Sequence, residues 1–327
     1  EMHFVAALDS VPQMRSVLCL FEGVVTGAAD GYGRVAGKPA ATLLHLGPGL
    51  ANGLANLHNA RRASTPLVNI VGDHATYHLQ YDAPLTSDIV GFARPVSSWI
   101  HESKNADSVA SDAARAVQAA RAAPGGVSTL ILPADTAWNE AQRAEQKLPD
   151  LLPTPVSSNA IDAAARLLSN GRKTALLLRG ASLYGAGLEA AGRVQAKTGA
   201  RLLCDTFAPH AELGAGRVPV ERIPYFAEQI VDFLKDFEQI IFVGAKPPVS
   251  FFAYPGKPSW CVPEGSHLSY LAHAHQDGAQ ALAALADTLG APARSPVRIP
   301  LQLPELPDGP LTALGVAQVI AAVTPDN

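Results

Sequence analysis

The stretch EGVVTGAADGYGR, residues 22–34, is the most distinctive part of this 327-residue chain. Apolar residues recur at about every third or fourth position from Glu22 to Ala36, which predicts a helix. Glu22 stands at the head of this helix and directly follows the apolar run Val17–Phe21. Its carboxylate would therefore lie among apolar groups at the positive end of a helix dipole. Two interpretations stand at this point: an ordinary first-turn acid that stabilises the helix, or a group with a chemical role.

Short apolar runs alternate with helical patterns throughout the rest of the chain. In the first half the predicted strands are 40–46, 67–71 and 127–132, and the predicted helices are 50–62 and 107–122. In the second half the predicted strands are 174–178, 201–204 and 240–243, and the predicted helices are 160–168, 187–198, 226–234 and 279–289. This rhythm predicts an α/β fold with two parallel-sheet domains.

Proline-rich segments divide the chain. We expect a first domain over residues 1–148, a linker over 149–155 and a second, Rossmann-like domain over 156–290. Residues 291–327 would form another linker and then, from a helix at 311–323, the start of a further domain. The opening residues have a helical pattern, so we expect a strand of the first domain to precede them.

Composition excludes several classes of protein. Apolar residues make up 48% of the chain and charged residues 17%, which suits a large buried core rather than disorder. The formal net charge is −4 and no Lys/Arg cluster occurs, so we expect no nucleic-acid partner. The three cysteines are scattered, which fits a reducing, cytoplasmic location. No apolar run has membrane-spanning length, so we expect no membrane partner.

Two histidines lie at the carboxyl ends of predicted strands, where ligands collect in open α/β sheets. His45 ends the first strand, and Gly47-Pro48-Gly49 then predicts a tight turn whose backbone a cofactor could approach closely. His74 follows Gly72-Asp73 at the end of the second strand, and a His beside an Asp suits proton transfer near neutral pH. The alternatives are a buried structural histidine and a polar loop. The spacing from His74 to His78 could also hold a metal, but no HExxH pattern supports this interpretation.

The second half carries weaker signals. Arg179-Gly180 and a glycine-rich turn at 185–187 follow a predicted strand, and Asp205 ends the next one. This spacing does not match the dinucleotide fingerprint, so glycines for a tight turn are the simpler interpretation. Phe251 and Phe252 lie in an aromatic loop that would either line a pocket or cover a sheet edge.

Taken together, residues 22–34 resemble the thiamine-diphosphate (ThDP) enzymes of the acetolactate synthase and benzoylformate decarboxylase group. In that family a glutamate opens this helix and the pattern A-D/E-G-Y-A-R/Q follows; here it is ADGYGR at 29–34, with Gly33 for the usual alanine. Later blocks also match, namely GKPA at 37–40, GPG at 47–49, Asn52, NLHNA at 56–60, TPLV at 65–68 and VG at 71–72.

The resemblance implies a pyrimidine-binding domain, a central domain and a diphosphate-binding domain, of which the third is absent from this chain. Its Gly-Asp-Gly motif, which holds Mg²⁺ and the diphosphate, does not occur here, so the resemblance places no metal ligand in this chain. Glu22 would hydrogen-bond a ring nitrogen of the cofactor's aminopyrimidine. Glu22, Gly47, Pro48, Gly49 and Asn52 are the implied cofactor-binding residues.

The resemblance also implies an activity on 2-keto acids, namely decarboxylation, carboligation or both, through a C2 carbanion and an enamine. Glu22, His45 and His74 are the implied catalytic residues, and His45 occupies the place of an active-site histidine of benzoylformate decarboxylase. The implied substrate pocket comprises Asp73, His74, Phe251 and Phe252. We expect a homodimer or homotetramer without FAD. The alternatives are a flavin-containing acetolactate synthase proper and a ThDP-binding paralogue without turnover.

Overall fold

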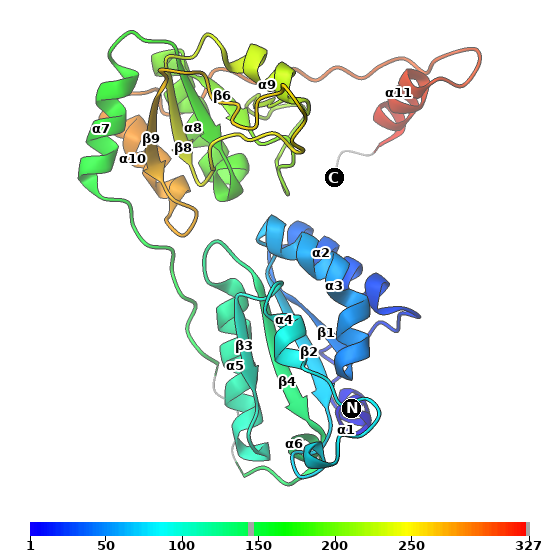
Figure 1. Cartoon of the computed structure of the whole chain (residues 1–327). Coiled ribbons are helices and arrows are strands. Elements are labelled where there is room, and N and C mark those ends of the chain that lie inside the picture. Colours follow the sequence, from blue (N-terminus) through cyan, green and yellow to red (C-terminus); the bar gives the residue numbers. More distant parts are fainter. Residues whose placement is uncertain (143–146, 325–327) are drawn as a thin grey trace. The chain divides into compact units, whose positions relative to one another are not determined.

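The computed structural model describes residues 1–142 and 147–324. They form two compact units, each with its own parallel sheet (Figure 1). The first unit comprises Glu1–Pro155 with the short segments Phe207–His210 and Ala274–Asp277, and the second comprises the remainder. Both are α/β, which confirms the predicted fold class. The boundaries of the functional domains stay a prediction, and residues 325–327 of the expected last segment lie outside the described part.

The first unit contains a four-stranded parallel sheet of order β1-β2-β4-β3. Its strands are β1 (Ala40–His45), β2 (Leu67–Asp73), β3 (Trp99–Glu102) and β4 (Val127–Pro133). Its helices are α1 (Met2–Leu8), α2 (Glu22–Ala36), α3 (Leu46–Ala63), α4 (Ile89–Ala93), α5 (Ala106–Arg121) and α6 (Ala134–Trp138), with a 3₁₀ turn at Leu79–Tyr81. β2 and β4 are central and entirely or almost entirely buried, so they carry continuous apolar runs.

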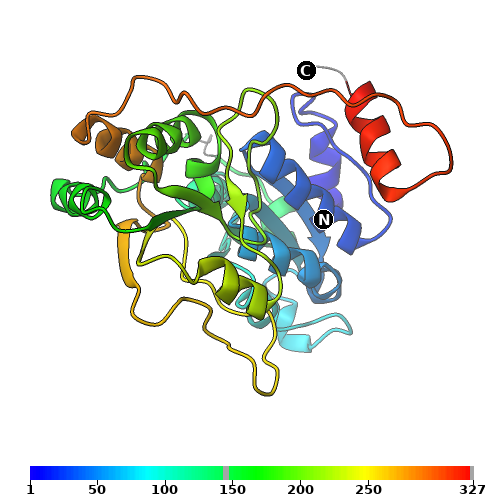
Figure 2. The same ribbon diagram turned by 90° about the horizontal axis from the view of Figure 1, so that it is seen from above.

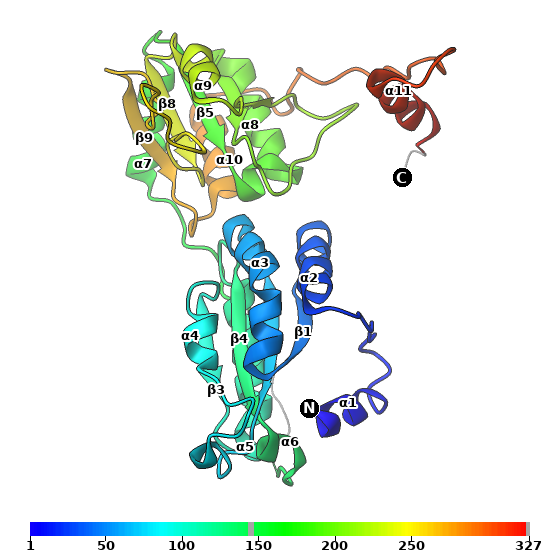
Figure 3. The same ribbon diagram turned by 45° about the vertical axis from the view of Figure 1, so that its right-hand side comes forward.

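Helices cover both faces of this sheet (Figure 3). One core packs residues of α2, α3 and α4, such as Ala29, Leu57 and Ile89, against Val71 and Ile131. The other packs Ala116 and Ala120 of α5 against the opposite side of the same strands. Because all four strands are parallel, their carboxyl ends lie along one edge of the sheet.

Two local predictions are wrong. Gly47-Pro48-Gly49 is not a free turn, because α3 begins at Leu46 and includes all three residues; proline is tolerated in a first helical turn, where its missing N–H is not needed. The run Val17–Phe21 does not surround Glu22 with buried apolar groups. Within the described chain its side chains are mostly exposed, with Leu20 at 97%.

The ADGYGR motif joins α2 to the turn before β2. The buried carboxylate of Asp30 accepts hydrogen bonds from Arg34 Nε at 2.9 Å and Nη2 at 2.6 Å, one helical turn away. It also accepts one from Thr65 Oγ1 at 2.6 Å. A buried carboxylate is tolerated where it is paired and hydrogen-bonded in this way. The acid and the basic residue of the motif therefore have a structural role in this chain.

We expect Gly33→Ala to destabilise the protein, although alanine is usual at this place in the family that the sequence resembles. A Cβ at position 33 would lie 2.5 Å from Thr65 Cγ2 and 2.9 Å from the Pro66 carbonyl oxygen. Overpacking costs ~1–3 kcal/mol and the helix propensity of alanine returns ~1 kcal/mol, so the net loss of unfolding free energy should be up to about 2 kcal/mol. Urea unfolding measures it.

Gly31→Ala is the matched control on the same helix. A Cβ there meets nothing within 4 Å. This substitution should stabilise the protein slightly through helix propensity alone. Equal effects of the two substitutions would contradict the tight packing described for Gly33.

The second unit contains a five-stranded parallel sheet of order β7-β6-β5-β8-β9. Its strands are β5 (Thr174–Leu178), β6 (Arg201–Cys204), β7 (Glu221–Arg222), β8 (Gln239–Val243) and β9 (His267–Ala272). Its helices are α7 (Ser158–Leu168), α8 (Gly185–Thr198), α9 (Ala227–Leu234), α10 (Gly278–Thr288) and α11 (Ala313–Val323), with a 3₁₀ turn at Gly180–Leu183.

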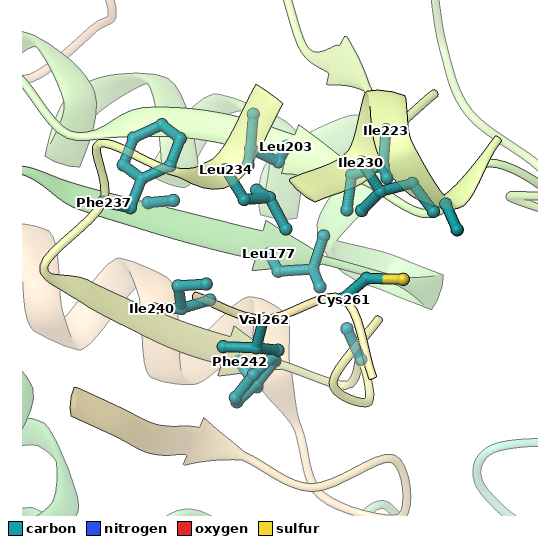
Figure 4. Packing of buried hydrophobic residues seen from close by; sticks show 13 residues of the cluster. Leu177, Leu203, Ile223, Ile230, Leu234, Phe237, Ile240, Phe242, Cys261 and Val262 are labelled. Atoms are coloured by element: carbon teal, nitrogen blue, oxygen red, sulfur yellow. The ribbon is translucent and has the colours of Figure 1, made fainter. Parts of the chain in front are cut away.

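The sheet of the second unit lies between α9 on one side and α8 with α10 on the other (Figure 2). On the α9 side, Leu177, Leu203 and Phe242 pack against Ile230 and Leu234 (Figure 4). Among the described residues, no helix combines the length and apolarity needed to cross a membrane.

Candidate active site

Glu22 is the first residue of α2, and its side chain is partly buried at the helix N-terminus. Its carboxylate oxygen Oε2 accepts a hydrogen bond from Asn52 Nδ2 at 3.3 Å. Asn52 lies on α3, 30 residues further along the chain, so the contact joins the heads of two neighbouring helices. The structure therefore brings together Glu22 and Asn52, two of the residues that the sequence predicted to bind a cofactor.

Close packing of α2 against α3 fixes the position of Glu22. Thr26 Oγ1 donates to the carbonyl oxygen of Gly53 at 3.2 Å, and Asn56 Nδ2 donates to that of Gly23 at 2.7 Å. A Cβ on Gly53 would lie 2.9 Å from Thr26 Cγ2, so the close approach of the two helices requires glycine there. These contacts fix the N-terminus of α2 against α3.

The junction between β1 and α3 brings His45 beside Glu22. The strand passes directly into the helix because Leu46 adopts a left-handed backbone conformation with φ of 54°, which is uncommon for a residue other than glycine. A Cβ on Gly49 would lie 3.3 Å from His45 Cβ and 3.5 Å from Glu22 Oε1. A side chain at position 49 would therefore contact both His45 and Glu22, and glycine avoids this contact.

Gly47 of the same motif packs against a different segment of the chain. A Cβ on Gly47 would lie 2.3 Å from Ser87 Cβ, so this glycine allows the first turn of α3 to pack on the segment before α4. Pro48 is exposed. Gly49 is the glycine of this motif whose added Cβ would contact both Glu22 and His45.

His45 is the last residue of β1, and a carboxylate that the sequence gave no reason to suspect contacts its ring. Nδ1 of His45 lies 3.0 Å from both carboxylate oxygens of Glu1, although 44 residues separate the two. In the sheet His45 lies opposite Gly72 of β2. The predicted position of His45 at the carboxyl end of a strand, next to the end of another, is therefore correct.

Asp73 and His74 follow at the end of β2. Burial raises the pKa of the Asp73 carboxyl, and the nearby carboxylates Glu102 and Glu1 act in the same direction, against the opposing hydrogen bond from the His74 amide. Asp73 Oδ1 accepts that hydrogen bond at 2.7 Å. Nε2 of His74 is buried without a hydrogen-bond partner in the described part of the chain. A buried polar atom of this kind is one that a ligand could satisfy.

Asp135 holds the loop that carries His74. It accepts hydrogen bonds from the Thr76 amide at 2.9 Å and from Thr76 Oγ1 at 2.6 Å. Burial would raise the pKa of the Asp135 carboxyl, but these bonds outweigh it and hold the pKa below its usual value. The rings of His74 and His78 lie 5.5 Å apart. Across residues 1–142 and 147–324, no group of three or more possible metal ligands is found.

The remaining predicted residues lie in the second unit. Phe251 and Phe252 pack edge to face with ring centroids 4.6 Å apart, and more than half of each side chain is exposed. The substrate pocket of Asp73, His74, Phe251 and Phe252 stays a prediction. Asp205 forms an ion pair with Arg179 at the ends of β6 and β5.

Comparison with known proteins identifies the family that this chain resembles. Residues 1–93 match the family "Thiamine pyrophosphate enzyme, N-terminal TPP binding domain". The chain is a relative of the ThDP enzymes of the acetolactate synthase and benzoylformate decarboxylase group. The resemblance seen in the sequence is thereby confirmed.

One curated relative matches the whole chain. It is the "Putative acetolactate synthase large subunit IlvX" of Mycobacterium tuberculosis, 50% identical over 328 residues, which cover 100% of this chain and 62% of the relative. A benzoylformate decarboxylase of Pseudomonas aeruginosa is 32% identical over 166 residues, which cover 50% of this chain and 31% of the decarboxylase. The chain thus spans less than two thirds of the length of these relatives.

Solved structures of ThDP enzymes share the fold. A structure described as a "putative thiamin diphosphate-dependent enzyme", from Mycobacterium smegmatis, superposes with a TM-score of 0.80 at 22% identity, covering 98% of this chain and 65% of its own. A 4-hydroxybenzoylformate decarboxylase of Rhodococcus jostii gives 0.79 at 21% identity, covering 100% and 65%. Each of the two parallel-sheet units therefore has the fold seen in these solved structures.

Proposed function

We propose that the full-length protein is a ThDP-dependent enzyme that acts on 2-keto acids by decarboxylation, carboligation or both. The observation that carries this proposal is the position of Glu22. Its carboxylate stands at the head of α2 and contacts Asn52 of α3, and it faces the bare backbone of Gly49. A carboxyl group held on a rigid support beside an open backbone surface fits a planar nitrogen heterocycle.

In this proposal Glu22 hydrogen-bonds a ring nitrogen of the aminopyrimidine and holds or moves a proton at that atom. Gly49 allows close approach of the ring, and Asn52 orients the carboxylate through Oε2. When bound, ThDP supplies a carbon nucleophile and an electron sink for the bond beside the keto group. The protein's side chains bind and orient the substrate and transfer protons.

His45 and His74 are the proposed proton-transfer groups. Loss of CO₂ leaves a carbon that must take up a proton before an aldehyde can form, whereas carboligation requires that carbon to wait for a second carbonyl compound. Imidazole suits proton delivery at neutral pH. Two features support this role, namely the position of both His45 and Glu22 close to Gly49 and the unpartnered Nε2 atom of His74 in the described part of the chain.

Other parts of the proposal extend beyond this chain. The ligands of Mg²⁺ and of the diphosphate would come from a third domain outside residues 1–327. Phe251 and Phe252 would contribute to the substrate pocket, and the protein would be a cytoplasmic homodimer or homotetramer without FAD. Mass photometry and metal analysis of the purified protein would measure the oligomer and its Mg²⁺.

Two alternative functions compete with this proposal. The relative at 50% identity carries the name of an acetolactate synthase, which favours carboligation and keeps a flavin-containing enzyme open. The Arg179–Asp205 ion pair occupies the strand ends where a nucleotide's ribose would be bound, which favours an enzyme without flavin. A paralogue without turnover is the third possibility, and the geometry around Glu22 favours catalysis instead.

The test is an assay of the full-length protein with and without ThDP and Mg²⁺. Pyruvate and benzoylformate serve as an alkyl and an aryl 2-keto acid, and aldehyde and 2-hydroxyketone are measured side by side. We expect at least one of the two 2-keto acids to be consumed in a cofactor-dependent reaction. Flavin absorption in the purified protein would support the flavin enzyme. ThDP binding without turnover of any 2-keto acid would support the inactive paralogue.

A further inference from the structure

We infer that Glu1 is the positioning residue of His45: its carboxylate binds Nδ1 and thereby directs Nε2 of the imidazole to the reaction. This inference rests on the proposed function. Both carboxylate oxygens of Glu1 lie 3.0 Å from His45 Nδ1. The Glu1 side chain is 21% exposed, whereas that of His45 is 59% exposed. A mostly buried carboxylate thus holds one side of a ring whose other side faces solvent.

The fold makes a specific place for this carboxylate. His45 of β1 lies opposite Gly72 of β2, and the Glu1 side chain lies over Gly72. A Cβ on Gly72 would be 2.1 Å from Glu1 Oε1 and 2.5 Å from Glu1 Cδ. Any side chain at position 72 would therefore displace the carboxylate. Glycine at the end of β2 is what allows Glu1 to reach His45.

The chemistry of the two groups fixes the protonation pattern of the ring. An ionised carboxylate only accepts hydrogen bonds, so Nδ1 must carry a hydrogen. In the neutral ring Nε2 is then the acceptor, and in the protonated ring it is the donor. Proton transfer by His45 is thereby assigned to Nε2. Without Glu1, the ring is free to rotate and to exchange tautomers, which reduces the fraction of molecules ready to deliver a proton.

The experiment compares Glu1→Ala, Gly72→Ala, His45→Ala and the double variant Glu1→Ala/His45→Ala in the full-length protein. Glu1→Ala removes the carboxylate. Gly72→Ala retains the glutamate at position 1 but displaces its carboxylate from His45. We expect each to lower kcat for aldehyde formation by ~10-fold or more, with KM and ThDP affinity nearly unchanged, and to raise the share of 2-hydroxyketone. Glu1→Gln keeps an acceptor oxygen and should rescue part of the loss.

Two readouts separate positioning from a merely structural role. In the His45→Ala background, Glu1→Ala should have no further effect on kcat or on the product ratio. Additive effects in the two backgrounds, or an unchanged product ratio in a folded Glu1→Ala variant, would overturn the inference. Glu22→Gln is assayed in parallel: if it too leaves turnover unchanged, the proposed function fails; if it alone abolishes turnover, only the role of Glu1 fails.

Discussion

Glu22→Gln in the full-length protein is expected to lower turnover of a 2-keto acid by ~10²-fold or more while leaving the fold intact, because it removes a general acid–base contribution. Glutamine has nearly the same shape and can still accept a hydrogen bond from Asn52, so the contact between α2 and α3 should survive. Steady-state kinetics at saturating ThDP and Mg²⁺ measure the effect, and urea unfolding checks the fold.

Glu140→Gln is the matched control for this substitution. Glu140 is exposed and lies outside the cluster around Glu22, so the same chemical change there should leave kcat unaltered. Near-normal turnover in Glu22→Gln would remove the proposed role. A comparable loss in both variants would point to an effect of net charge rather than to the site.

His45→Ala is expected to slow aldehyde formation by ~10²-fold and to increase the proportion of carboligated product, because a general acid contributes on this scale. The physical reason is competition for one carbon: a slower proton leaves more time for a second carbonyl compound to react. Aldehyde and 2-hydroxyketone are quantified in the same reaction by chromatography, over a range of concentrations of the acceptor aldehyde.

His58→Ala provides the control for loss of a histidine. His58 is exposed on α3, the helix that follows His45, and should change neither the rate nor the product ratio. An unchanged rate and ratio in His45→Ala would instead make His45 a structural residue. If His74→Ala shifts the ratio where His45→Ala does not, the proton donor belongs to the end of β2.

Much of the fold could be predicted from local patterns. The helix Glu22–Ala36 and the strands Thr174–Leu178 and Arg201–Cys204 have the predicted bounds, because helical periodicity and short, fully apolar runs are strong signals. β3 and β9 were missed, since Trp99–Glu102 and His267–Ala272 are only partly buried and carry polar residues. The start of α3 was misplaced because the glycines and proline suggested a turn, whereas proline fits a first helical turn.

The site was predictable only where its members follow strands or open helices. Glu22, His45 and His74 stand at such places, and the structure brings both Glu22 and His45 close to Gly49. Glu1 could not have been found, because its contact with His45 depends on the absence of a side chain at Gly72, which no local pattern reveals. Asp135 was missed for a similar reason: its partner, Thr76, lies 59 residues away.

The glycine at position 33, where the family usually has alanine, has a structural explanation. In the sequence it is only a glycine where alanine is usual. In the structure the segment Thr65-Pro66 approaches α2 so closely that a methyl group would meet both a side chain and a backbone oxygen. The departure therefore reflects packing between α2 and the start of β2, and it casts no doubt on Glu22.

The most direct test of the central claim is hydrogen–deuterium exchange at the reactive ring carbon of ThDP bound to the full-length protein, measured by quenched-flow and NMR for wild type and Glu22→Gln. This exchange reports proton removal itself and is independent of substrate identity. We expect the rate to fall by ~10²-fold or more in the variant, since Glu22 is the proposed acid–base group for this step. Equal rates in a variant that binds ThDP normally would contradict the account.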